Sequence, residues 1–244
     1  MLKEPTPRAF ARRLRGRRVA RVDRRGKILL AFTAPTDGEV DAPVLVLHFG
    51  MTGRPLVVSP TTDVHRWDRL VCDLDSGEQF RYRNSRRLGS IRLIPRTDVA
   101  DLLWGLGPDP LEAPKSWFTE ALRARRGPVK AVLLDQGFLA GVGNIYADEA
   151  LFAAGVRPDR PGRSLSPAEA GVLHGALRRV LGRAVRAQVA GRDARLSLGG
   201  LRTEASRNLA RTGSPGVGCP RCGRALRASR LGGRTSYWCP RCQR

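Results

Sequence analysis

Residues 219–244 read CPRCGRALRASRLGGRTSYWCPRCQR and contain two Cys-Pro-Arg-Cys turns. Cys219 and Cys222 form the first pair, Cys239 and Cys242 form the second, and 16 residues separate the pairs. This spacing is typical of a zinc ion held by four thiolates. A segment this short cannot bury enough apolar surface to fold alone, so the metal supplies folding free energy on the order of 10 kcal/mol. We therefore expect one structural zinc ion at these four cysteines.

Two other interpretations of the paired cysteines are a pair of disulfides and a redox-active CxxC motif. The chain shows no secretory signal, and both pairs share the same turn sequence, which favours zinc. The fifth cysteine, Cys72, lies in RLVCDLD, residues 69–75. These residues alternate in the manner of a half-buried strand, so we expect Cys72 to be a core thiol rather than a ligand.

The charge of the chain is its strongest bulk signal. Among 244 residues, 44 are Lys or Arg and 22 are Asp or Glu, which gives a formal net charge of +22. Such an excess is the electrostatic footprint of a protein that binds a polyanion, and nucleic acid is the usual one. The alternative is a solvated, arginine-rich surface. No apolar run approaches the roughly 18 residues that a membrane span needs, so we expect a soluble, cytoplasmic protein without a membrane partner.

Lysine is rare in this basic chain. Only Lys3, Lys27, Lys115 and Lys130 are lysines, and every other basic residue apart from the three histidines is arginine. A desolvated lysine can lose its proton, whereas arginine cannot. A lysine retained in this background is therefore a candidate for a chemical role.

The spacing of apolar residues changes along the chain. Residues from about 17 to 95 read as seven short alternating strands separated by turns rich in Gly, Pro and Asp, which predicts a β-sandwich or barrel. Four later segments, 116–126, 127–136, 144–155 and 166–188, place apolar residues at helical spacings. The sequence thus predicts an α+β protein. We divide it into a β-sandwich domain (1–96), a helical domain (97–212) and a zinc finger (213–244).

Two helix starts carry local signals. Ser166, Pro167 and Glu169 form an N-cap, a first helical position and a capping box. The glycines of DQGFLAGVGNIYADEALF leave backbone N–H groups uncovered where the helix at Asn144 begins. An uncovered helix N-terminus beside an amide side chain is a ready phosphate site.

These motifs together resemble the formamidopyrimidine-DNA glycosylase and endonuclease VIII family. GFLAGVGNIYADEALFAAGVRPDRP, residues 137–161, looks like the helix-two-turn-helix of that family, and the cysteine-rich end looks like its zinc finger. RRGKILL, LHFGMTG, RYRNSRRLG and LGPDPL are similar to motifs of the formamidopyrimidine branch. The resemblance covers residues from about 12 to the end, in the order that the family has.

The resemblance implies a bifunctional enzyme of DNA base-excision repair. The family excises oxidised purines such as formamidopyrimidine and 8-oxoguanine, and then cleaves the abasic site by β- and δ-elimination. It implies phosphate contacts at Lys27, Asn144 and Arg234, with Lys130 as a further basic residue near the DNA. Because a flipped base leaves a void in the stack, it also implies three void-filling residues, which are Met51, Arg86 and Leu88. Leu88 replaces the usual phenylalanine and should fill less space.

The sequence departs from the family pattern at its start. The family nucleophile is the amine of an N-terminal proline, and a glutamate follows it. In this sequence Met1 is followed by Leu2 and Lys3 instead. Glu4 and Pro5 are the right residue types in the wrong order. Three explanations compete: a translation start assigned too late, a short form that binds damaged or abasic DNA without excision, and a weak lyase that uses the Met1 amine or a lysine such as Lys27. An α-amine titrates at about 7.7 to 8.0, so part of it is neutral at physiological pH.

An alternative hypothesis is that the protein is not an enzyme. It would then be a zinc-ribbon transcription or ribosome-associated factor that binds nucleic acid in a purely structural role. Such a factor should not prefer an abasic-site duplex over an intact one. The stretch GGLRTEASRNLARTGSPGVG, residues 199–218, stands where the family has its lesion-capping loop and is short and atypical. We expect a monomeric, nucleoid-associated bacterial protein whose partner is double-stranded DNA with damaged bases or abasic sites.

Overall fold

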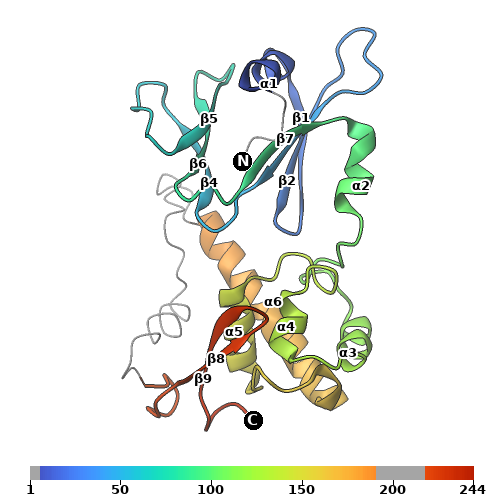
Figure 1. Ribbon diagram of the computed structural model, residues 1–244, viewed down its shortest axis with the longest axis vertical. Coiled ribbons are helices and arrows are strands. Elements are labelled where there is room, and N and C mark those ends of the chain that lie inside the picture. The colour runs from blue at the N-terminus through green and yellow to red at the C-terminus, as the bar shows by residue number, and fades with distance from the viewer. Residues whose placement is uncertain (1–5, 191–217) are drawn as a thin grey trace. The chain divides into compact units, whose positions relative to one another are not determined.

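The computed structural model describes residues 6–190 and 218–244, and these fall into two compact units. The first unit holds the described residues up to Trp104, and the second begins at Gly105. Figure 1 shows both units and labels most of their helices and strands. The predicted domain boundaries at residues 96 and 212 remain predictions.

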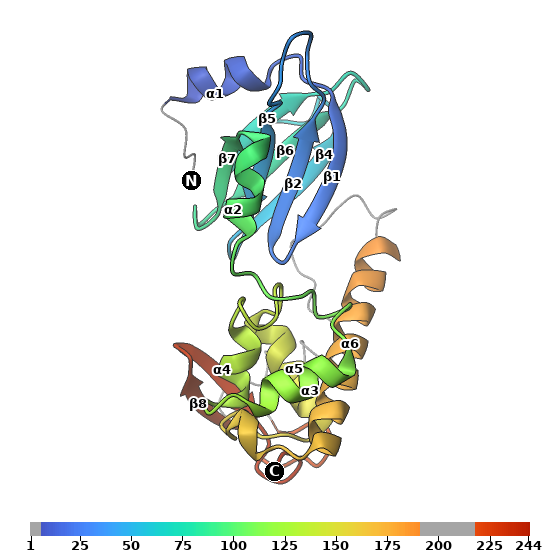
Figure 2. The same cartoon turned by 90° about the vertical axis from the view of Figure 1, so that its right-hand side faces the viewer.

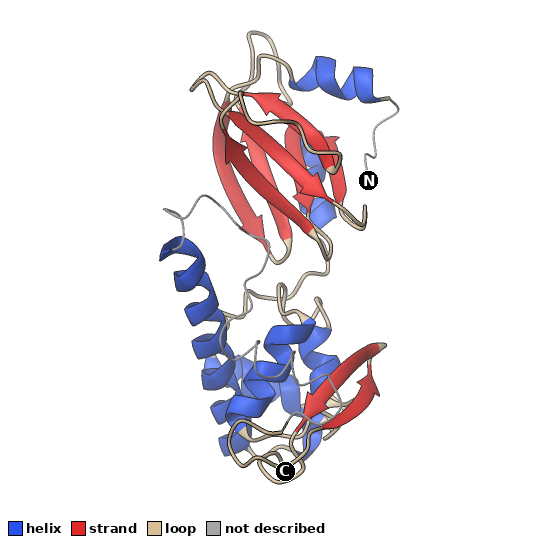
Figure 3. Cartoon of the chain, turned by 90° about the vertical axis from the view of Figure 1, so that its left-hand side faces the viewer, coloured by secondary structure: helices blue, strands red, loops and turns tan. Residues whose placement is uncertain are grey.

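The first unit is a sandwich of two antiparallel sheets, as Figure 3 shows. One sheet has the strand order β1-β2-β3-β7 and the other has the order β4-β6-β5. All seven strands fall on the segments that the alternating sequence predicted. Their bounds are β1 Val19–Arg25, β2 Ile28–Thr33, β3 Val44–His48, β4 Gly53–Val58, β5 Asp68–Asp73, β6 Gln79–Asn84 and β7 Ser90–Ile94.

Alternation along β2 and β3 builds two apolar layers, one on each face of the larger sheet. Leu45 and Leu47 point into the sandwich, where they join Tyr82 of the smaller sheet. Val44 and Val46 point the other way and join residues of α2, Val99–Leu103. The helix α2 therefore covers the outer face of the larger sheet, and Figure 2 shows it lying there.

The helix α1, Pro7–Leu14, was not predicted from the sequence. Its arginines obscure the apolar stripe, since Phe10 is its single buried residue. The start carries ordinary signals: Thr6 is the N-cap and accepts a hydrogen bond from the Ala9 N–H at 3.1 Å, and Pro7 occupies the first turn. Phe10 closes one edge of the sandwich core.

The second unit is helical around one apolar core, and its four main helices match the predicted segments. The predicted capping box is present, since the Glu169 N–H donates to Ser166 Oγ at 3.2 Å and the Ser166 N–H donates to Glu169 Oε2 at 2.8 Å. No helix among the described residues is long and apolar enough to cross a membrane. The helices are α3 Lys115–Arg123, α4 Val129–Leu134, α5 Asn144–Ala154 and α6 Pro167–Ala190.

A hairpin of β8, Arg227–Leu231, and β9, Arg234–Trp238, completes the second unit. It lies beside α5, and Figure 1 shows it in red next to that helix. The observed architecture is the predicted α+β combination of a β-sandwich, a helical domain and a β-hairpin zinc finger.

Candidate functional site

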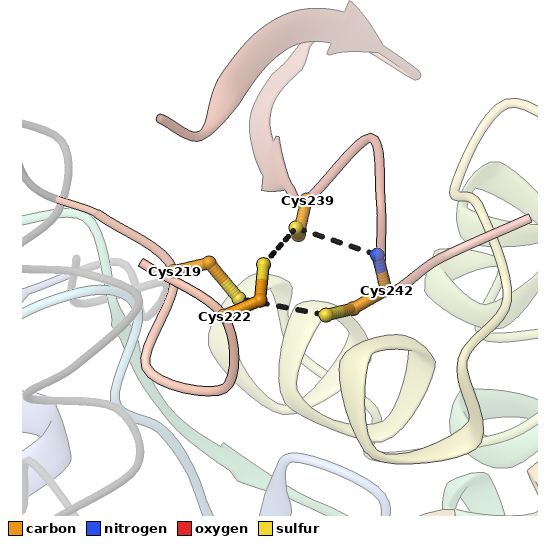
Figure 4. A group of neighbouring side chains, drawn as sticks. All are labelled: Cys219, Cys222, Cys239 and Cys242. Carbon is orange, nitrogen blue, oxygen red and sulfur yellow. Dashed lines mark hydrogen bonds between the residues drawn. The ribbon is translucent and has the colours of Figure 1, made fainter. Parts of the chain in front are cut away.

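The four cysteines of the C-terminal segment converge on one point, as Figure 4 shows. All four are free thiols, and their sulfur atoms lie within 4.8 Å of one another. Cys219 Sγ is 3.8 Å from Cys242 Sγ, and Cys222 Sγ is 3.6 Å from Cys239 Sγ. Four sulfurs around a tetrahedral zinc ion with bonds of about 2.3 Å stand about 3.8 Å apart. The donor set and its spacing therefore fit one structural zinc ion.

Electrostatics among the thiols also call for a cation. Burial opposes ionisation of Cys239, but the backbone N–H groups of Cys242 and Arg241 and the neighbouring thiols outweigh it and lower the pKa of Cys239 to about 7. Burial and the neighbouring thiols raise the pKa of Cys242 to about 12. Four thiolates this close repel one another unless a positive ion lies between them.

The zinc finger is bound to the helical core by its last residues. The side chain of Gln243 accepts a hydrogen bond from the Cys239 N–H and donates one to the carbonyl of Val156, both at 2.9 Å. Arg244 and residues 155–157 exchange two backbone hydrogen bonds. The Gln243 side chain thus links the metal ligand Cys239 to the turn that follows α5.

The helix α5 presents an uncapped N-terminus next to the hairpin. Gly143 is its N-cap residue, no side chain caps it, and no acidic residue lies in its first turn. Asn144 is the first helical residue, and its Nδ2 atom donates to the carbonyl of Thr235 at 3.4 Å. Its Oδ1 atom is buried without a hydrogen-bond partner among the described residues. Free N–H groups at a helix start favour an anion.

Two cations that the resemblance implied for DNA contact occupy opposite environments. Arg234, at the start of β9, is exposed. Lys130 in α4 is fully buried, and its Nζ atom is 2.8 Å from Asp148 Oδ1 and 3.0 Å from the carbonyl oxygen of Thr235. Burial lowers the pKa of Lys130 and raises that of Asp148, against the pull of their mutual ion pair. Lys130 therefore faces protein groups.

Strand registers place three turns of the sandwich at one end. Ile28 pairs with His48, His48 pairs with Ser90, and Gly53 pairs with Asn84. The β1–β2 turn, the β3–β4 turn and the β6–β7 turn consequently lie side by side. They carry the predicted residues of the first unit, which are Lys27, Met51, Arg86 and Leu88.

The void-filling residues expected from the resemblance are close together and solvent-facing. Met51 is 61% exposed and Leu88 is 56% exposed, and the turn at Gly50 packs against the backbone of Leu88, which brings the two apolar side chains to the same place. Arg86 Nη1 lies 3.9 Å from Met51 Sδ, and the Arg86 N–H donates to Thr52 Oγ1 at 3.2 Å. An apolar tip flanked by a guanidinium group therefore projects from these turns.

The turns under that tip are held tightly. A side chain at Gly50, where φ is +62°, would meet the backbone of Leu88 at 2.6 Å. The buried Tyr82 hydroxyl donates to the carbonyl of His48 at 2.9 Å, and Asn84 Nδ2 donates to that of Phe49 at 3.2 Å. The tip is thus supported by the sandwich core.

Sequence reasoning missed His48, which lies near Lys27 at this end of the sandwich. Its Nδ1 atom accepts the Gly50 N–H at 3.3 Å, so the neutral ring carries its proton on Nε2. Burial, with the nearby Lys27, lowers the pKa of His48 and so favours the neutral ring. The only signal in the sequence is a polar residue that ends an otherwise apolar strand.

Comparison with known proteins identifies the family to which these features belong. The formamidopyrimidine-DNA glycosylase N-terminal domain matches residues 1–91, the H2TH domain of that glycosylase matches residues 106–194, and the zinc finger found in FPG and IleRS matches residues 219–244. The chain belongs to the formamidopyrimidine-DNA glycosylase family. This finding confirms the resemblance that the sequence motifs showed.

Curated members of the formamidopyrimidine-DNA glycosylase family match along most of their length. The protein from Chloroflexus aurantiacus is 38% identical over 244 residues, which cover 98% of this chain and 84% of the relative. That from Thermomicrobium roseum is 40% identical over 261 residues, which cover 100% of this chain and 87% of the relative. Both bear the name formamidopyrimidine-DNA glycosylase.

Solved structures of family members share the fold. Lactococcus lactis Fpg in complex with DNA containing an abasic site has a TM-score of 0.79 and 25% identity, covering 97% of this chain and 86% of that one. The complex of the same protein with DNA containing Fapy-dG has a TM-score of 0.77 and 26% identity, with the same coverage.

Two expectations from the sequence fall on residues that the structure does not describe. They are the substitute amine at Met1 and the lesion-capping loop, of which residues 199–217 lie outside the described residues.

Proposed function

We propose that this protein recognises damaged sites in double-stranded DNA in base-excision repair, and that removal of oxidised purines with cleavage of the abasic site is the activity its family implies. The observation that carries the proposal is the exposed tip of Met51 and Leu88, supported from below by the sandwich core. An apolar side chain that projects from a rigid turn can fill the space that an extruded base leaves.

Groups at the base of the tip are suited to the DNA backbone. Lys27 offers a cation, and His48 offers an Nε2–H donor from the same end of the sheet. Arg86 adds a guanidinium group beside Met51. Phosphate contacts of this kind fix the register of a protein on the duplex, while the apolar tip tests whether a base has left the stack.

The second unit offers a separate set of phosphate donors. The uncapped N-terminus of α5, with the Asn144 side chain, provides oriented N–H groups, and Arg234 provides an exposed guanidinium on the adjoining hairpin. The two are far apart in the sequence and lie near each other in space because the zinc finger packs on α5. Both the metal and the net charge of +22 serve this interface.

Excision in this family needs an amine that attacks the sugar carbon and forms a Schiff base. No Pro-Glu pair among the 244 residues matches the family motif, so the nucleophile is not assigned. A second candidate function is therefore the binding of damaged or abasic DNA without excision. The Met1 amine and Lys27 are the amines that would act if the 244 residues have lyase activity.

Borohydride trapping separates the two candidates. The 244-residue protein is mixed with a duplex that contains an abasic site, and any Schiff base is reduced to a stable adduct. We expect tight binding with little or no adduct; an adduct that peptide mapping places at Met1 or Lys27 identifies the substitute nucleophile. Rapid single-turnover excision of 8-oxoguanine by these 244 residues would contradict the view that a proline amine is needed.

A further inference from the structure

A buried polar cluster lies between α4, α5 and the zinc hairpin, outside the residues assigned to phosphate contact above. Lys130 and Asp148 form its ion pair, with Nζ to Oδ1 at 2.8 Å and to Oδ2 at 3.0 Å. Ser236 Oγ donates to Asp148 Oδ1 at 2.7 Å. Lys130 Nζ also donates to the carbonyl oxygen of Thr235 at 3.0 Å. The pair thus joins two helices to successive residues of β9.

Because the cluster is buried, its stability depends on both members of the ion pair. Lys130 and Ser236 are fully buried, and Asp148 is 7% exposed. A buried ion pair adds little stability compared with apolar residues, but the loss of one partner leaves an uncompensated charge, which is strongly unfavourable. Removal of either charged partner alone should therefore loosen the hairpin.

The carbonyl of Thr235 connects the cluster to the phosphate donors. It accepts hydrogen bonds from Lys130 Nζ and from Asn144 Nδ2, at 3.0 and 3.4 Å. Arg234 is the preceding residue and begins the exposed part of β9. Lys130 consequently fixes the backbone that carries Arg234 at the N-terminus of α5.

We infer that Lys130 is a positioning residue: with Asp148 it locks the zinc hairpin onto α5 and so places Arg234 beside Asn144 for a shared DNA phosphate. The inference replaces the direct DNA contact that the resemblance implied for Lys130. It rests on the proposed function only for the identity of the ligand, since the docking itself is a property of the protein.

The first test measures docking without DNA. In Lys130→Met, hydrogen exchange of the peptide that spans 227–238 should accelerate at least about tenfold, while the zinc content stays at one per chain. Lys130→Met/Asp148→Asn removes both charges and keeps an acceptor for Ser236, so it should restore most of the protection. Lys115→Met removes an exposed lysine of the same unit and should change nothing. Unchanged exchange in Lys130→Met would overturn the inference.

The second test asks whether Lys130 acts through Arg234. Lys130→Met and Arg234→Ala should each weaken binding of an abasic-site duplex by about tenfold, and the double variant should be no weaker than Arg234→Ala alone. Additive losses of about a hundredfold, with normal hairpin protection, would show that Lys130 meets the DNA itself and would overturn the inference. If the wild-type protein showed no preference for damaged DNA, the proposed function would fail while the exchange result still decided the docking role.

Discussion

At the scale of single residues, Glu149 shows how burial changes the chemistry of one carboxyl group. It lies in α5 and is 4% exposed, and its Oε1 atom has no hydrogen-bond partner among the described residues. Burial and the neighbouring Asp148 raise the pKa of Glu149 to about 7, while Arg183 opposes them. A carboxyl group in this state is protonated in the folded protein over a range where the unfolded chain is ionised.

The variant Glu149→Gln should therefore change how stability depends on pH. Between pH 4.5 and about 7 the folded wild-type protein binds a proton that the unfolded chain has lost, so its free energy of unfolding falls as pH rises through this window. Glutamine carries no such proton. The free energy of unfolding of the variant, relative to that of the wild type, should therefore rise by up to about 3 kcal/mol between pH 4.5 and 8. Urea titrations at several pH values measure this difference. Glu120→Gln, on the exposed face of α3, is the control and should follow the wild type.

Leu88 permits a second test at this scale. The side chain is 56% exposed at the tip formed with Met51, and a phenylalanine there should cover more of an unstacked base pair. Leu88→Phe should tighten binding of an abasic-site duplex by about fivefold, equivalent to roughly 1 kcal/mol, and leave binding of the intact duplex unchanged. Fluorescence anisotropy with the two duplexes measures both. Equal tightening of both would mean that Leu88 contacts DNA without sensing the void.

At the scale of elements, local patterns predicted most of the fold. Alternation located all seven strands of the sandwich, and the capping box at Ser166 and Glu169 located the start of α6. The helix α1 was missed because its one buried side chain, Phe10, stands among arginines. Its burial depends on residues of the sandwich core that are distant in sequence, and no local pattern reports such a contact.

The candidate site was predictable to the extent that its chemistry is local. The spacing of the four cysteines predicted the zinc site, and the comparisons and the sulfur geometry confirm it. The burial of Lys130 was not foreseen, because its partners Asp148 and Thr235 come from other elements. A lysine within the apolar run of α4 is the signal that could have raised the question. The DNA-contacting roles of the individual residues remain predictions.

The zinc finger supplies a prediction for a whole element. Purified protein should carry about one zinc ion per chain, because four thiolates complete a tetrahedral site. Cys239→Ser should lose the ion and unfold the finger, since metal binding supplies its folding free energy. Affinity for duplex DNA should then fall with the loss of Arg234, as measured by metal analysis and anisotropy on the same sample. Full DNA affinity without zinc would remove the hairpin from the interface.

At the scale of the whole molecule, the net charge of +22 predicts a steep dependence of DNA binding on salt. Each phosphate contact contributes about 0.9 to the slope of log affinity against log salt. Lys27→Met and Arg234→Ala should each lower the slope by about 0.9, whereas Lys115→Met should leave it unchanged. Equal slopes in all three variants would assign the salt dependence to a diffuse basic surface.

The preference for damaged over intact DNA is the most direct test of the account. Equilibrium binding is measured at one salt concentration for two duplexes of identical sequence, one with a single abasic site and one without. The exposed tip predicts at least about tenfold tighter binding of the abasic duplex, and Met51→Ala should reduce that preference while leaving the affinity for intact duplex within twofold. Equal affinity of the wild-type protein for both duplexes would contradict the account and favour a zinc-ribbon protein that binds nucleic acid without sensing damage.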